Sequence, residues 1–191
     1  VPAQWVNIQA MLSYGDWIWD SNASGYFWNQ LGQPLKNTNG DVASGIMAPD
    51  HLHATIDQKG VKVGGSAQTT GSISADFIPF KGFRIGADWV FNARNYSDYQ
   101  ISSSDFENGG TIAVADPWEI PWGQQLDLNA SYRFKIGGVN ATLYGNVYNL
   151  FNYNYIVDAY NKSTQKGEWD NVFRVFYSFG RTYSLRLKIN F

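Results

Sequence analysis

Cysteine is absent from this chain of 191 residues, which excludes disulfides and thiolate metal sites. Charged residues are scarce: they make up 16% of the chain, against about 25% in ordinary soluble domains. The net charge of −2 gives no basic footprint for nucleic acid, so we expect no nucleic-acid partner. No apolar run approaches the ~20 residues of a membrane-spanning helix. A helical membrane protein and a nucleic-acid-binding domain are therefore both disfavoured.

Aromatic residues are abundant instead, at 17% of the chain, and they alternate with polar ones. The last ten residues show this most clearly, because every second side chain is apolar: Tyr183, Leu185, Leu187, Ile189 and Phe191. The residues between them are polar or charged. A period of two over this length predicts a strand with one apolar face and one wet face.

The same alternation recurs along the chain and predicts seven antiparallel strands, paired in sequence order. They cover 4–14, 17–30, 66–79, 83–96, 124–135, 139–152 and 181–191. Most are longer than the ~5–6 residues usual in soluble sheets, and they fit the ~9–11 residues of a tilted membrane strand. The pattern favours membrane strands.

The predicted connections alternate in length. Short turns are expected at Gly15-Asp16, Phe80-Lys81-Gly82 and Ile136-Gly137-Gly138, and long loops at 31–65, 97–123 and 153–179. Short turns on one side and long loops on the other are typical of outer-membrane barrels, with the short turns periplasmic. The expected fold class is all-β, a transmembrane antiparallel β-barrel.

Seven strands are an odd number, whereas bacterial single-chain barrels are almost always even. We therefore expect the N-terminus and C-terminus of this chain to lie on opposite membrane faces. We also expect strand 181–191 to pair with a strand missing from this sequence, because lipid does not tolerate an open sheet edge.

Several segments resemble one family. Asn149-Leu150-Phe151-Asn152, followed by 154–159, resembles a signature near the end of TonB-dependent receptors. Residues 180–191 resemble the final strand of those receptors, which ends in an aromatic residue. Residues 13–19, 60–64 and 79–83 are similar to members of Bacteroidetes type.

The resemblance implies a plugged barrel of about 22 strands, of which residues 1–191 are the C-terminal part, without the plug domain. It implies a multi-pass protein of the Gram-negative cell outer membrane that takes up a scarce nutrient, such as a siderophore, haem, peptide or glycan. The implied partners are the plug and earlier strands of the same receptor, the lipid bilayer, and the periplasmic TonB complex through a missing N-terminal region. No cofactor and no catalysis are implied.

Aromatic residues in the long loops are candidates for a ligand vestibule, since exposed rings stack on ligands. They are Tyr99, Trp118, Trp122, Tyr155, Tyr160 and Trp169. The alternative is that these rings pack the loops onto one another above the strands, because an ordered loop must bury apolar surface.

Two histidines, His51 and His53, lie on one side of an extended segment. Two ligands are too few for a structural zinc site, so we predict no metal there. Charges on the polar parity could contact a plug, a substrate or only water: Asp20, Asp76, Arg84, Asp88, Arg94, Asp127, Arg133, Lys135, Arg186 and Lys188.

Aromatic residues beside the short turns and the C-terminus predict a periplasmic girdle at the membrane interface. They are Tyr14, Trp17, Phe77, Phe83, Phe134 and Phe191.

Two rival functions stay open at this point. An outer-membrane barrel enzyme needs a nucleophile and a base, and His51 and His53 are the only histidines. A soluble all-β binding module such as a lectin needs polar residues where the strands carry Phe and Trp.

Overall fold

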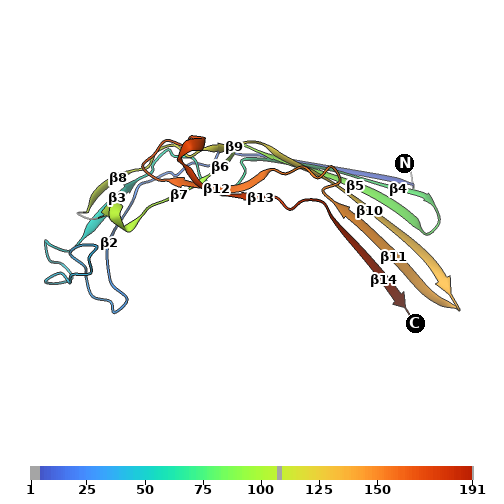
Figure 1. Cartoon of the computed structure of the whole chain (residues 1–191), viewed down its shortest axis with the longest axis horizontal. Coiled ribbons are helices and arrows are strands. Elements are labelled where there is room, and N and C mark those ends of the chain that lie inside the picture. The colour runs from blue at the N-terminus through green and yellow to red at the C-terminus, as the bar shows by residue number, and fades with distance from the viewer. Residues whose placement is uncertain (1–4, 107–108, 191) are drawn as a thin grey trace.

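The computed structural model describes residues 5–106 and 109–190, and this part of the chain is all-β. Six long strands form one antiparallel sheet, in which neighbours follow sequence order (Figure 1). They are β1 (Val6–Tyr14), β4 (Thr69–Phe80), β5 (Phe83–Ala93), β10 (Gly123–Ile136), β11 (Val139–Tyr148) and β14 (Thr182–Asn190). Among the described strands, β1 and β14 each pair on one side only, so the sheet stays open.

The register places apolar side chains on the same face of all six strands. One row across the sheet runs Phe77–Ile85–Ala130–Gly145–Leu185, and each step is a direct cross-strand partner. The row on the other side of the pleat begins with Asp76 and Gly86 and continues to Asn129, Asn146 and Ser184. We call these the apolar face and the polar face of the sheet.

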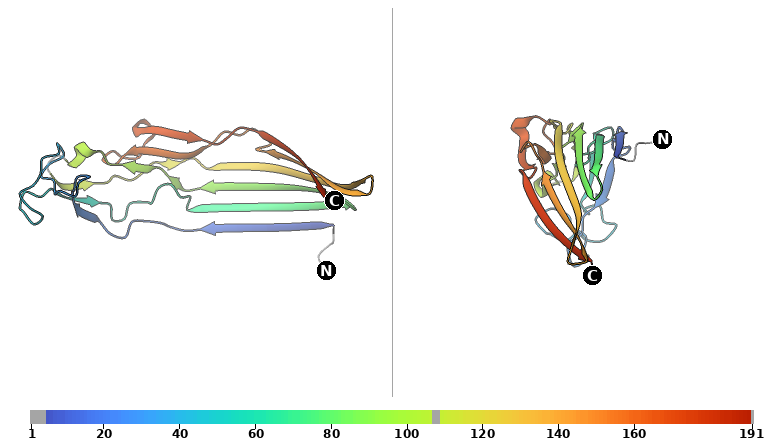
Figure 2. Two further views of the ribbon diagram at one scale, coloured as in Figure 1. Left: turned by 90° about the horizontal axis from the view of Figure 1, so that it is seen from below. Right: turned by 90° about the vertical axis from the view of Figure 1, so that its right-hand side faces the viewer.

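The apolar face has no second layer of described chain over it, and Figure 2 shows the six strands as a single layer. Large side chains on this face are open: Leu12 is 72% exposed and Leu185 is 77% exposed. The buried apolar residues lie mostly outside the six long strands, in the connections between them: Ala43, Leu52, Ala54, Val61, Ile112, Val114, Ile120 and Ala159. Ordinary burial against a protein core therefore does not account for the apolar face.

Two tight turns define one end of the sheet, which we call the turn end. Gly82 turns β4 into β5 with a φ of 91°. Gly137 and Gly138 turn β10 into β11 with φ values of 54° and 89°. Two successive residues with positive φ are the pattern of a type I′ hairpin turn, which glycine adopts at no steric cost.

The long connections gather at the opposite end, the loop end, and contain smaller sheets. Each of the two three-stranded sheets includes a parallel pair. One contains β2 (Ala23–Tyr26), β3 (His53–Asp57) and β8 (Gly110–Ala113), and the other contains β13 (Val172–Tyr177), β12 (Ile156–Lys162) and β7 (Asp98–Gln100). β6 (Asn95–Tyr96) pairs with β9 (Glu119–Ile120), and single-turn 3-10 helices form at η1 (Ser103–Phe106) and η2 (Trp169–Asn171). No helix in the described ranges is long and apolar enough to cross a membrane.

Six of the seven predicted strands are confirmed, but the strand expected over 17–30 is wrong. The chain does not reverse at Gly15-Asp16; it continues away from β1 and runs beside residues 60–68, with Trp19 N donating to Val61 O at 2.9 Å. The indole of Trp17 lies over Gly15, where a Cβ atom would collide with it. Gly15 is thus needed for ring packing, and only β2 within 17–30 forms a strand, in a separate sheet.

The main sheet therefore has an even number of strands. The expectation that the two ends of the chain lie at opposite ends of the strands, and so on opposite membrane faces, is also wrong. β1 begins and β14 ends at the turn end (Figure 1). Tyr14 and Trp17 consequently lie toward the loop end and cannot belong to an aromatic girdle beside the turns, and Phe191 is outside the described residues.

Aromatic rings do cluster at the turn end, in a set that shares Phe77, Phe83 and Phe134 with the predicted girdle. Phe80 stacks on Phe83 at 5.1 Å between ring centroids, and Tyr132 stacks on Phe134 at 5.6 Å. Trp5 meets Phe77 edge to face at 5.6 Å. We call this set the turn-end aromatic cluster: Trp5, Phe77, Phe80, Phe83, Tyr132 and Phe134.

Replacing Gly71 with Ala should destabilise the sheet by about 1–3 kcal/mol, the usual range for overpacking. Gly71 is buried beneath the ring of its cross-strand partner Phe91, and a Cβ atom there would collide with that ring. Gly145→Ala is the matched control, since its Cβ would meet only Leu185 Cδ1 at 3.9 Å. The urea midpoint of unfolding measures both, and equal midpoints would contradict the packing described.

Candidate functional site

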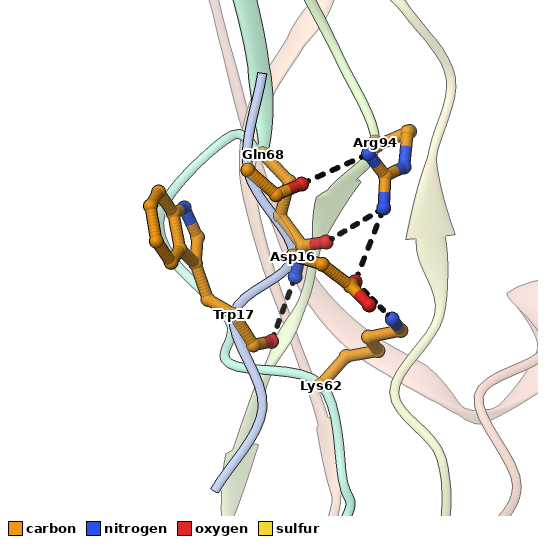
Figure 3. Close-up of polar contacts among 6 residues, drawn as sticks. Asp16, Trp17, Lys62, Gln68 and Arg94 are labelled. Carbon is orange, nitrogen blue, oxygen red and sulfur yellow. Dashed lines mark hydrogen bonds and ion pairs between the residues drawn. The ribbon is translucent and has the colours of Figure 1, made fainter. Parts of the chain in front are cut away.

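Arg94 stands at the end of β5 and joins the loop end to three strands of the sheet. Its guanidinium donates to Gly15 O at 2.9 Å, to Asp16 Oδ1 at 3.1 Å and to Gln68 Oε1 at 3.2 Å (Figure 3). It also lies over the ring of Tyr14, 4.7 Å from the centroid. Arg94 therefore fixes where the chain leaves β1 and where it enters β4.

The other contacts around Arg94 are made by residues of the connection between β1 and β4. Gln68 is 1% exposed, and its side-chain nitrogen donates to Trp17 O at 2.8 Å. Lys62 donates to Asp16. The hydrogen bond from Lys62, assisted by the charges of Lys62 and Arg94 and opposed by desolvation, lowers the pKa of Asp16. The cluster satisfies its own charges, which is the arrangement of a structural brace.

Asn149 closes the base of the connection between β11 and β14. It is 2% exposed, has a φ of 54°, and its amide nitrogen donates to the carbonyls of Tyr153 and Phe179, both at 3.0 Å. Its Oδ1 accepts from Tyr153 N at 2.9 Å, and its own N–H donates to Asp127 Oδ1 at 2.8 Å. Asparagine tolerates the left-handed region better than other non-glycine residues, so one residue both turns the chain and binds both sides of the loop base.

Asn152 repeats this arrangement three residues later, with a φ of 54° and an Oδ1 that accepts from Arg181 N at 2.8 Å. The Asn-Leu-Phe-Asn segment singled out in the sequence is thus a loop clamp built from two asparagines. Sequence inspection alone had no means of assigning this role, because the partners are backbone groups 29 and 30 residues away.

The six aromatic residues predicted to form a vestibule all belong to segments of the loop end. Trp118 and Trp169 meet at 5.4 Å between centroids and join two long connections. The hydroxyl of Tyr99 donates a hydrogen bond to Gln58 Oε1. The ring centroids of Tyr160 and Phe173 are 6.5 Å apart. Tyr155 lies against Gly123 and stacks on Tyr153 at 6.2 Å, whereas Trp122 is 52% exposed. Most of these rings contact other parts of the loops.

A recess of about 460 Å³ does occur at the loop end, with a different lining. Polar side chains and one aromatic ring line it: Gln100, Ser102, Asp105, Lys162, Thr164, Gln165 and Phe173. Amide, hydroxyl and charged groups around one ring are suited to a polar solute. The sequence search missed these residues because it weighed aromatic side chains and not the polar ones at the ends of β7 and β12.

His51 is buried, and both of its ring nitrogens are engaged. Nδ1 lies 2.8 Å from Ile46 O and Nε2 lies 2.9 Å from Phe27 O, while the rings of Tyr26 and Trp28 pack at 4.6 and 4.9 Å. His53 is exposed and lies 4.7 Å from the ring of Tyr26. No group of three metal-ligating side chains occurs within residues 5–106 and 109–190. His51 holds loop backbone in place.

Eight of the ten charges predicted on the polar parity of the strands lie on the polar face. The acidic ones have polar partners there: Asp76 pairs with Arg84, and Asp88 accepts from Asn129 at 2.9 Å. Asp127 accepts from Gln125 at 2.8 Å and from the backbone of Asn149. Asp20 and Arg94 lie outside the ladder of the main sheet. The polar face is therefore an organised, hydrogen-bonded surface.

No protein-family model, no curated protein and no solved structure matches this chain.

Replacing Asn149 with Ala should open the loop base, because two carbonyls and one N–H lose their partner. Each of these partly buried hydrogen bonds contributes about 0.5–1.5 kcal/mol. Proteolysis under native conditions should then cut residues 153–179 several-fold faster. Asn154→Ala is the control, since Asn154 is exposed in the same connection. Equal cleavage of the two variants would refute the clamp.

Asp98→Asn should stabilise the loop end at neutral pH. Burial first, and the nearby charge of Asp158 second, raise the pKa of Asp98. When folding raises the pKa of a carboxyl, the folded state favours the protonated form. Ionisation of that carboxyl at higher pH therefore lowers the free energy of unfolding. We expect Asp98→Asn to raise the free energy of unfolding at pH 7 by only about a few tenths of a kcal/mol, because water screens a partly exposed group.

The gain from Asp98→Asn should shrink as the pH falls toward the ordinary aspartate value of 3.8. Asp170→Asn, at an exposed position, is the control. Thermal midpoints measured at several pH values give the comparison, and a gain that grew on acidification would have the wrong sign.

Proposed function

We propose that this chain forms part of the wall of a transmembrane β-barrel in the outer membrane, as the C-terminal part of a TonB-dependent receptor that imports a scarce nutrient. The observation that carries this proposal is the uncovered apolar face, which stays in register across six strands. Burying such a face in lipid removes it from water without a second protein layer. The chain is proposed to supply binding and passage, and no chemistry of its own.

The length of the strands supports lipid as the environment of the apolar face. The six strands contain 9, 12, 11, 14, 10 and 9 residues in sheet order. Crossing the hydrocarbon layer at a tilt takes ~9–11 residues per strand. A soluble sandwich with strands of this length would need a second sheet over the apolar side chains.

The two ends of the sheet support an orientation. The turn end has short glycine turns and the turn-end aromatic cluster, and aromatic rings prefer the membrane interface. The loop end has the long connections with their own buried residues. In outer-membrane barrels short turns face the periplasm and long loops face outward, so the recess beside Phe173 would meet solutes from outside.

The open edges of β1 and β14 support a larger barrel. Each edge presents a row of backbone N–H and C=O groups, and each group left unpaired in hydrocarbon costs several kcal/mol. Further strands beside β1 and β14 remove this cost. The resemblance of residues 149–159 and 180–191 to TonB-dependent receptors supports one chain as their source, and a siderophore, haem, peptide or glycan as the class of nutrient.

The membrane part of the proposal is tested by two substitutions at neighbouring positions of β4. Ile73 lies on the apolar face and is 48% exposed, and Ser74 lies on the polar face beside Asp88. Ile73→Arg should cost ~2–4 kcal/mol in lipid and reduce the heat-resistant folded fraction in outer membranes. Ser74→Arg should assemble normally.

A protein that is folded and monomeric in buffer without detergent, with both arginine variants equally stable, would refute the membrane proposal. Uptake is tested separately, with candidate nutrients given to cells with and without a protonophore. Uptake that depends on this protein but not on the energised membrane would refute the TonB-dependent part alone.

A further inference from the structure

A pocket opens beside the apolar face of the sheet, near the loop end of β5 and β10. It holds about 270 Å³, and its lining includes Trp89, Gln124, Leu126, Asn149, Phe151 and Tyr153. Trp89 and Leu126 are direct cross-strand partners, and Gln124 is the partner of Phe91, so these side chains share the parity of the apolar face. Phe151 and Tyr153 come from the connection that follows β11. We call this recess the Trp89 pocket.

Gln124 gives the Trp89 pocket an oriented hydrogen-bond donor. Its Oε1 accepts from the indole Nε1 of Trp89 at 2.9 Å, which fixes the orientation of the amide. The two N–H groups of Gln124 Nε2 then have no acceptor in the described part of the chain. Asn149, by contrast, uses its amide on the backbone of Tyr153 and Phe179. The pocket therefore offers one amide donor beside aromatic rings.

The aromatic rings of the Trp89 pocket are held in place but remain accessible. Trp89 lies 5.1 Å from Phe91 between ring centroids, whereas Phe151 is 74% exposed and Tyr153 is 42% exposed. A sugar ring has apolar C–H groups on its faces and hydroxyl groups at its edge. It can therefore pack on an aromatic side chain while one of its hydroxyls accepts from an amide. The pocket suits a sugar ring better than a purely apolar group.

Arg181 adds a positive charge next to the Trp89 pocket. Its backbone N–H donates to Asn152 Oδ1 at 2.8 Å, and its Nη1 donates to Leu150 O at 3.2 Å. Arg181 thus contacts both chain neighbours of Phe151. Its side chain is exposed and makes no ion pair within residues 5–106 and 109–190. A guanidinium with N–H groups to spare is well suited to a phosphate group.

An apolar groove adjoins the Trp89 pocket on the same face. It holds about 570 Å³, and its lining includes Ile85, Leu128, Ala130, Gly145 and Leu185. Ala130 and Gly145 are direct partners between Ile85 and Leu185, and their small size lowers the surface there. From Gln124 in the pocket to Ala130 in the groove, β10 spans ~20 Å. A polar pocket that leads into an apolar groove matches a molecule with a polar head and an apolar tail.

We propose that the Trp89 pocket and the groove bind a membrane glycolipid with a phosphorylated sugar head group. The sugar ring lies against Trp89 and Phe151, the phosphate lies at Arg181, and an acyl chain follows the groove. This inference rests on the proposed function, because there the apolar face turns to lipid and the loop end lies at the outer interface. The site lies away from the recess beside Phe173, so lipid binding is separate from nutrient binding.

The test uses the full-length protein purified in detergent, and native mass spectrometry measures the fraction of protein that carries one added molecule. The probes are lipid A, which is a phosphorylated glucosamine lipid, phosphatidylglycerol, which has a phosphate but no sugar ring, and glucosamine 1-phosphate, which has no acyl chain. Lipid A should bind at least tenfold more tightly than the other two. Equal binding of phosphatidylglycerol would overturn the sugar assignment, and equal binding of glucosamine 1-phosphate would overturn the lipid assignment.

Three variants test the head-group contacts and the groove separately. Gln124→Met removes the amide at similar size and should weaken lipid A binding about fivefold, the loss expected for one hydrogen bond. Arg181→Gln should weaken it about tenfold and abolish the preference for lipid A over its dephosphorylated form. Gly145→Leu fills the groove and should weaken binding several-fold. The controls Gln9→Met and Arg174→Gln, at exposed positions outside both recesses, should bind like the unmodified protein.

The heat-resistant folded fraction of each variant is measured in parallel, so that a loss of binding is scored only on assembled protein. A folded, detergent-requiring protein whose lipid A binding is unchanged in all three variants would overturn the inference while the proposed function stands. A protein that is folded and monomeric without detergent would instead refute the proposed function.

Discussion

The register of five strand pairs is the constraint on which the rest of this structure depends. Side chains alternate between faces with a period of two, so a slip of one residue in any pair would turn an apolar strand side toward the polar face. All five pairs of the main sheet keep the same parity from β1 to β14, except beyond a register shift between Phe77 and Phe80 at the turn end of β4. The apolar face and the hydrogen-bonded polar face both follow from this agreement.

Sequence alternation was sufficient to predict six of these strands, because each strand has one polar and one apolar side. The same reasoning failed at 17–30, where Trp17 and Trp19 alternate with other residues but pair with residues 60–63 on an extension of β1 and β4. Alternation reports that a segment is extended; it does not report its partner. Gly15 looked like a turn residue, and its role is to accept the indole of Trp17.

The loop end was much less predictable than the sheet. Its small sheets include parallel pairs such as β3 with β8 and β12 with β7, which join segments far apart in the chain. Asn149, Gln68 and His51 act through backbone groups, which carry no sequence signal of their own. The loop aromatics were visible in the sequence, but whether a ring meets a ligand or another ring depends on contacts between separate loops.

The hairpin turns at Gly82 and Gly137-Gly138 have a consequence for how the chain folds. They join β4 to β5 and β10 to β11 through only a few residues, so these two hairpins can form early and independently. The other pairs must close connections such as residues 15–68, at an entropic cost that rises by about 0.6 kcal/mol with each doubling of length. We therefore expect folding to proceed as the joining of preformed hairpins. We expect the contacts of Arg94 with Gly15 and Asp16, and of Asn149 with Phe179, to form after the hairpins, since they reach segments outside them.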